Sequence, residues 1–100
     1  MFLIQILLPV PTTKTAGRAG LLRDLNLALT EKFGGVTAYT RSPANGLWSN
    51  NGTVEEDDIV IVEVMAETLN EDWWARLREK LERDLNQEEI VIRAQEIRQL

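Results

Sequence analysis

The chain contains no cysteine and no histidine among its 100 residues. Without cysteine it has no disulfide framework, no thiolate nucleophile and no cysteine metal ligand. Without histidine it lacks the side chain that most often transfers protons near neutral pH and a common zinc ligand. The Gly-Lys-Ser/Thr spacing of a phosphate-binding loop is also missing. We therefore expect neither a metal nor a cofactor.

Basic residues are scarce in comparison with acidic ones, and the formal net charge is -5. Residues 1–50 hold five basic and two acidic side chains, whereas residues 51–100 hold six and fourteen. An acidic surface is repelled by a phosphate backbone and by an anionic lipid surface. We expect neither nucleic acid nor a membrane as the principal partner. The acidic run Glu55–Asp58 lacks calcium-loop spacing, and its side chains would alternate between the two faces of a strand.

Long apolar stretches are absent as well. The most apolar segment, Met1–Val10, is about ten residues long and contains Gln5. It is too short to cross a bilayer, and it has neither the basic flank nor the small-residue cleavage site of a secretion signal. We interpret it as the first strand of a cytoplasmic protein.

The spacing of apolar residues predicts four strands and two helices in the order β-α-β-β-α-β. The strand segments are continuous or alternating in apolar residues, and the helix segments repeat them every three or four positions. The expected strands are residues 2–8, 36–41 (resuming at 47–49), 55–66 and 89–95, and the expected helices are 21–33 and 68–86. This order is typical of one ferredoxin-like α+β domain spanning residues 1–100. Such a domain has an antiparallel sheet of order 4-1-3-2 with both helices on one face.

The start of the second helix has two competing caps. Thr68 and Glu71 have the spacing of a capping box, but Asn70 is also a good N-cap residue. Trp73 and Trp74 follow as neighbours, and adjacent helix positions point about 100° apart. We expect one indole in the core and the other at its rim.

The alternation of each strand assigns its side chains to two faces of the sheet. The expected helix-covered side chains are Ile4, Ile6, Val60, Val62, Val64, Ile90 and Ile92. The expected opposite side, which we call the open face, carries Leu3, Gln5, Leu7, Ile59, Ile61, Glu63, Met65, Val91, Arg93 and Gln95. A contiguous apolar surface of this kind usually marks an interface or a pocket.

The position of Tyr39 depends on the hairpin between the second and third strands. Asn51-Gly52 predicts a type I′ turn, and counting outward from it places Tyr39 opposite Val64, on the helix side. A bulge at residues 42–46, where Pro43 cannot donate a hydrogen bond to the ladder, would reverse the faces. We favour this second arrangement, with Tyr39 on the open face.

A row of polar side chains is predicted to cross the open face. Gln5, Glu63 and Arg93 lie near the middle of three neighbouring strands, and Tyr39 and Arg41 could extend the row on a fourth. Nearby cations favour the ionised form of Glu63, which suits a ligand anchor better than a general base. The row is either a set of polar contacts buried between subunits or a binding site for a small polar ligand.

The turn residues resemble those of a group of bacterial proteins. The segments Phe33-Gly34-Gly35-Val36-Thr37 and Gly46-Leu47-Trp48, followed by Gly52, are similar to the Gly-Gly-x-Thr, Gly-x-Trp and Gly pattern of small uncharacterised ferredoxin-like proteins. The resemblance covers residues 33–66. It implies the fold and a bacterial cytoplasmic setting, and it transfers no catalytic residue.

These observations favour a homo-oligomeric binding or structural module that associates through its open face, and not an enzyme. The alternative is a ligand-binding protein or enzyme that uses Gln5, Tyr39, Arg41, Glu63 and Arg93. A fold shared by many functions cannot decide between them.

Overall fold

The computed structural model of the protein describes residues 1–10, 16–50 and 52–100, apart from the side chains of residues 10, 16–19, 40–46, 48, 50 and 53–57. The elements follow the predicted order. They are β1 (Phe2–Val10), α1 (Ala16–Phe33), β2 (Thr37–Asn50), β3 (Thr53–Ala66), α2 (Glu71–Asp84) and β4 (Val91–Glu96).

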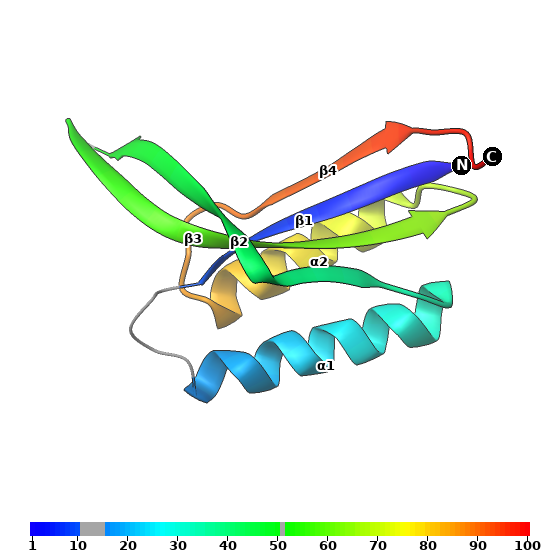
Figure 1. The fold of residues 1–100 in the computed structure, drawn as a ribbon, viewed down its shortest axis with the longest axis horizontal. Helices are drawn as coiled ribbons and strands as arrows, with labels where there is room; N and C mark the ends of the chain where they lie inside the picture. The colour runs from blue at the N-terminus through cyan, green and yellow to red at the C-terminus, as the bar shows by residue number, and fades with distance from the viewer. Residues whose placement is uncertain (11–15, 51) are drawn as a thin grey trace.

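The four strands form one antiparallel sheet in the order β2-β3-β1-β4. This is the predicted order, and both helices lie on the same side of the sheet (Figure 1). The ferredoxin-like α+β fold is therefore confirmed. Within the described ranges, neither helix has the length and apolar character needed to span a bilayer.

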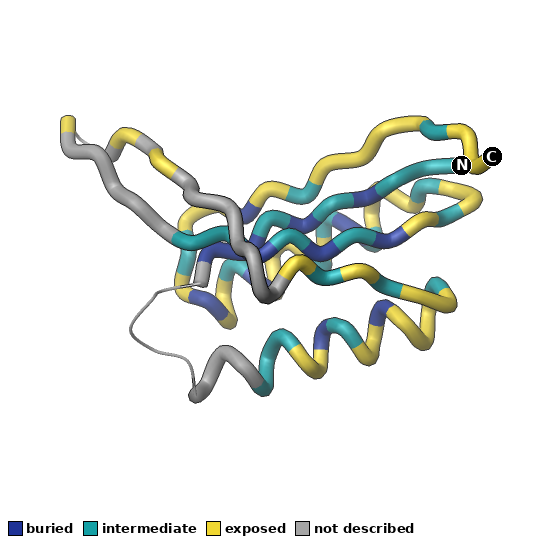
Figure 2. The backbone as a smooth tube through the Cα atoms, viewed as in Figure 1, coloured by how far each residue is buried: buried dark blue, intermediate teal, exposed yellow. Residues whose placement is uncertain are grey.

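The core lies between the sheet and the helices, and it is made of the side chains assigned to that face from the sequence. The buried positions run along every second residue of β1 and β3 and along the inner sides of both helices (Figure 2). Val62 is 1% exposed, and Ile59 and Ile61 beside it are only half-buried. Burial of aliphatic side chains contributes about 1.5–3 kcal/mol each, so this face supplies most of the driving force for folding.

Asn70 caps α2. Its side-chain oxygen accepts the Trp73 backbone N–H at 3.1 Å, so Asn70 and not Thr68 is the N-cap. The two indoles then diverge as expected, with Trp74 5% exposed in the core and Trp73 half-buried at its edge.

The β2–β3 hairpin is longer than the rest of the sheet and projects beyond it (Figure 1). β1 pairs with β3 only as far as Asp58. Residues 53–57 at the start of β3 pair with β2. Gly52 has the positive φ of 84° that the predicted turn requires, and Asn51 lies outside the described residues. The expected interruption of β2 at residues 42–46 is replaced by a continuous strand with a register shift between Tyr39 and Ala44.

Candidate functional site

Three strands bring the predicted polar row together at the centre of the open face. Gln5 of β1 lies opposite Glu63 of β3 on one side and opposite Arg93 of β4 on the other. The Gln5 amide links the two charged groups: its Nε2 donates to Glu63 Oε2, and its Oε1 accepts from Arg93 Nε at 2.8 Å. The row is therefore a hydrogen-bonded chain in which an amide separates the guanidinium from the carboxylate.

Tyr39 completes this chain from β2. Its hydroxyl donates to Glu63 Oε1 at 2.8 Å, and the residue is 46% exposed. The predicted placement of Tyr39 on the open face is confirmed, because the register shift pairs it with Ile61 of that face. The hydrogen bond to Glu63, together with the negative charge of that carboxylate, raises the pKa of Tyr39 above its ordinary value.

The two charged groups of the row, Glu63 and Arg93, have hydrogen-bonding capacity beyond their contacts with the described side chains. A carboxylate offers about four lone-pair positions, and Tyr39 and Gln5 each occupy one on Glu63. A guanidinium carries five N–H donors, and Gln5 accepts one from Arg93. Each charged group can thus bind a second molecule without losing its present partners.

Apolar side chains surround the polar row on the open face. Leu3, Leu7 and Ile61 are half-buried, although α1 and α2 both lie on the opposite side of the sheet (Figure 1). Met65 is 47% exposed and Val91 is 43% exposed. The arrangement of a polar centre within an apolar surround matches the face predicted from alternation.

Two sequence predictions fall partly or wholly outside the described side chains. Arg41 lies on β2, but its side chain is among those the structure does not describe, and the same holds for Glu55, Glu56 and Asp57. Among the residues whose side chains are described, no three carboxylates, imidazoles or thiols are grouped so that they could hold a metal ion.

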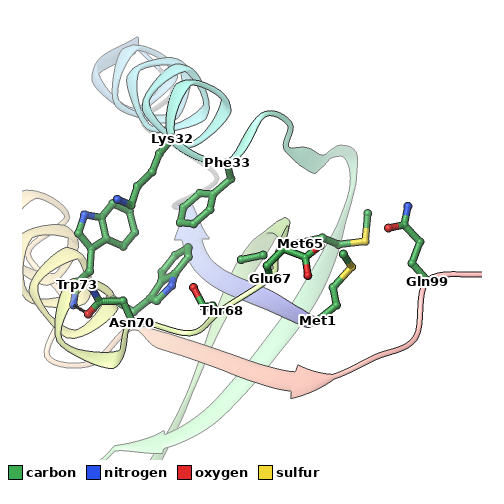
Figure 3. A pocket seen from close by; sticks show the side chains of 11 residues that line it. Met1, Lys32, Phe33, Met65, Glu67, Thr68, Asn70, Trp73 and Gln99 are labelled. Carbon is green, nitrogen blue, oxygen red and sulfur yellow. Dashed lines mark hydrogen bonds between the residues drawn. The ribbon is translucent and has the colours of Figure 1, made fainter.

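A pocket of about 580 Å³ lies at the end of the sheet where α1 ends and α2 begins (Figure 3). Phe33, Trp73 and Trp74 form an aromatic cluster on its wall. Phe33 stacks on Trp74 with ring centroids 5.3 Å apart, and Trp73 meets both rings edge to face. Lys32 places its ammonium 4.7 Å from the centroid of Trp73.

Sequence reasoning placed one of the two adjacent tryptophans in the core and the other at its rim, and it did not find this pocket. Its lining residues come from the end of α1, the end of β3, the β3–α2 loop, the first turn of α2 and both ends of the chain. No local spacing connects Lys32 with Glu67 or Trp73. The one sequence feature that pointed to the pocket was Trp73. Because it is adjacent to Trp74 on a helix and Trp74 lies in the core, Trp73 had to lie at the edge of the core.

Comparison with protein-family models and with curated proteins gave no match for this chain. Comparison with solved structures gave several. The divalent cation tolerance protein CutA1 from Thermus thermophilus superposes with a TM-score of 0.63 at 18% identity, covering 99% of this chain and 86% of that one. CutA1 from Pyrococcus horikoshii gives 0.57 at 13% identity, covering 100% and 86%.

A phage SAM lyase in complex with S-methyl-5′-thioadenosine is also similar, with a TM-score of 0.60 at 18% identity over 95% of this chain and 80% of that one. Identities this low establish a shared fold. They support the ferredoxin-like part of the resemblance seen in the turn residues, and they leave the function to be argued from the surface of this chain.

Proposed function

We propose that this protein is a cytoplasmic homo-oligomeric module whose subunits associate through the open face. The observation that carries the proposal is the charge distribution of the polar row. Glu63 lies on one side of Gln5 and Arg93 on the other, with both groups on the uncovered side of the sheet. A surface with opposite charges on either side of a central strand is complementary to a second copy of itself.

The proposed complementarity requires one particular arrangement of the two subunits. Consider two sheets packed face to face and related by a two-fold axis that runs along β1. Rotation about that axis carries β4 of one copy over β3 of the other. Arg93 of each subunit then faces Glu63 of its partner, and the apolar side chains around the row meet one another. Packed sheets are separated by about 10 Å, a gap that long side chains bridge.

The apolar surround supports association and the polar row fixes its orientation. Covering Leu3, Leu7 and Ile61 removes from water the apolar area that no helix shields. Charged pairs within such an interface add less to affinity than to the choice of register, because their desolvation offsets much of their attraction.

Exchange of charges between two variants tests the proposal. Glu63→Arg places two cations in the row, and Arg93→Glu places two anions there. Each variant alone should be monomeric, or nearly so, by sedimentation velocity at micromolar concentration. An equimolar mixture should recover the assembly, because every cross-subunit contact then joins unlike charges.

The matched control exchanges Lys80 and Asp84, which form a 2.6 Å ion pair on the exposed side of α2. Lys80→Glu and Asp84→Lys should leave assembly unchanged. A wild-type protein that sediments as an 11.4 kDa monomer contradicts the proposal. Assembly that persists in both row variants assigns it to a different surface.

The same row favours a second candidate function, the binding of a small polar ligand. Tyr39 and Gln5 orient the Glu63 carboxylate at a half-exposed position, and a bound ligand could use the remaining acceptor sites. Arg41 of β2 belongs to this candidate site as well. A monomeric wild-type protein that is stabilised thermally by a polar metabolite, with the effect lost in Glu63→Gln, would favour this function over association.

A further inference from the structure

The pocket at the end of the sheet is separate from the polar row. Neither Gln5, Tyr39, Glu63 nor Arg93 is among its described lining residues. Its volume of about 580 Å³ lies within the usual range for sites that bind small molecules. A ligand here would contact mainly the helix layer and the β3–α2 loop, and not the centre of the open face.

The walls of the pocket are apolar at two ends. The aromatic cluster forms one wall, and Met65 and Met1 lie at the other (Figure 3). Aromatic edges and faces, and polarisable thioethers, adapt to apolar groups of different shape. This surface is suited to an aliphatic or aromatic side chain of a ligand.

The polar groups are arranged on either side of that apolar surface. Lys32 is held over the ring of Trp73, which fixes the ammonium at the rim of the pocket. Asn70 also lines the pocket, and because its side-chain oxygen accepts the Trp73 N–H, its amide NH₂ is the group left to donate to a ligand. Together they present donors that suit a carboxylate.

A group of the opposite charge lines the same pocket. Among the described lining side chains two are charged, Lys32 and Glu67, one of each sign. Glu67 and the neighbouring Thr68 hydroxyl come from the β3–α2 loop and lie between the aromatic wall and the two methionines (Figure 3). They provide acceptors for an ammonium group.

We infer that this pocket binds a free α-amino acid with an apolar side chain. Lys32 and Asn70 would bind the α-carboxylate, Glu67 would bind the α-ammonium, and Phe33 with Trp73 would contact the side chain. A ligand with only one charge would leave either Lys32 or Glu67 uncompensated. A zwitterion satisfies both, and its apolar side chain matches the aromatic wall.

L-Phenylalanine is the probe for the test, because tryptophan fluorescence can be excited at wavelengths that phenylalanine does not absorb. Two of the three tryptophans of the chain, Trp73 and Trp74, line the pocket. Titration should give a saturable change in emission with a Kd on the order of 1 mM, typical of a ligand this small. N-Acetyl-L-phenylalanine, which lacks the ammonium, and L-phenylalaninamide, which lacks the carboxylate, should each bind about tenfold more weakly or worse.

Lys32→Met keeps the aliphatic stem over Trp73 and removes the charge. It should weaken L-phenylalanine about tenfold while leaving L-phenylalaninamide unaffected, and Glu67→Gln should show the same selectivity toward the N-acetyl compound. Lys80→Met is the matched control, since Lys80 lies on the far part of α2 and should not alter binding. Circular dichroism verifies that each variant is folded.

Three outcomes overturn the inference: no saturable change with L-phenylalanine, equal affinity for all three compounds, or unchanged affinity in both Lys32→Met and Glu67→Gln. The absence of a saturable change would not contradict the proposed assembly through the open face, because sedimentation tests assembly independently.

Discussion

Tyr39 reaches Glu63 diagonally across the β2–β3 ladder, because the residue directly opposite Tyr39 is Ile61. Its hydroxyl and the Glu63 carboxylate are joined at 2.8 Å, and the same carboxylate accepts the Gln5 amide. One acidic side chain thus connects β1, β2 and β3 on the uncovered side of the sheet. The chain contains a single tyrosine, so the ionisation of this contact can be observed directly.

The absorbance of tyrosinate should appear above the ordinary pKa of tyrosine, which is about 10. The neighbouring carboxylate accepts a hydrogen bond from the neutral phenol and repels the phenolate, so the pKa of Tyr39 is raised. The stabilising effect of this contact is fully present below pH 10 and is lost as the pH rises through the folded-state value. Ultraviolet pH titration of the folded protein measures it.

Glu63→Gln removes the charge and should move the tyrosine titration back toward that of a free tyrosine. Glu79→Gln, on the exposed side of α2, serves as the control and should leave the titration unchanged. Identical curves for the wild type and Glu63→Gln would contradict the contact.

Substitutions at neighbouring β3 positions should have different effects on the two faces of the sheet. Val62→Asp places a charge among buried aliphatic side chains and should cost about 4 kcal/mol or more, enough to unfold a domain of ordinary stability. Ile61→Asp lies on the open face and should give a folded protein with weaker self-association. Urea unfolding and sedimentation distinguish the two, and equal unfolding of both variants would show that the faces do not differ.

Loss of the Glu63 carboxylate should also reduce stability more than loss of an exposed charge on α2. Glu63→Gln weakens two hydrogen bonds to a charged acceptor and should lower the free energy of unfolding by about 1–2 kcal/mol. Glu79→Gln should change it by less than about 0.5 kcal/mol.

If association buries the row, adding Arg93→Gln to Glu63→Gln should restore part of the lost assembly, because the Arg93 charge is then no longer buried without a partner.

Asn70→Ala should destabilise the protein by about 1 kcal/mol, since the Trp73 N–H loses its acceptor at the start of α2. Asn70→Asp keeps an oxygen at the same place and should retain most of the stability. Urea denaturation measures both variants. If the two substitutions lower stability equally, the Asn70 cap does not account for the loss.

The fold and the two faces of the sheet could be predicted because successive strand side chains point to opposite faces and β3 carries valine at every second position from 60 to 64. Val60, Val62 and Val64 can only share one side of a strand, and β1 has a matching set. The polar row followed from the same periodicity, since Gln5, Glu63 and Arg93 interrupt three apolar strands near their centres. These are local patterns, and the structure confirms them.

The remaining features depend on distances that the sequence does not encode locally. The side of the sheet occupied by Tyr39 depended on the register shift between Tyr39 and Ala44, whose size no single local pattern encodes. The pocket required Lys32, Glu67 and Trp73 to meet from three segments. The start of α1 at Ala16 precedes the first apolar repeat at Leu21, because the apolar stripe marks only the part of a helix that packs on the sheet.

The register shift limits how the length of β2 can vary. Between the pairs Tyr39–Ile61 and Ala44–Ile59, β2 advances five residues and β3 two, an excess of three. As long as the bulge keeps its geometry, each residue added to or deleted from this stretch turns the following side chains over to the other face. Single-residue deletions here should exchange the two faces of either Tyr39 or the hairpin tip, whereas deletions of two residues should preserve both. Insertions and deletions in this part of β2 are therefore expected to be accepted in even numbers.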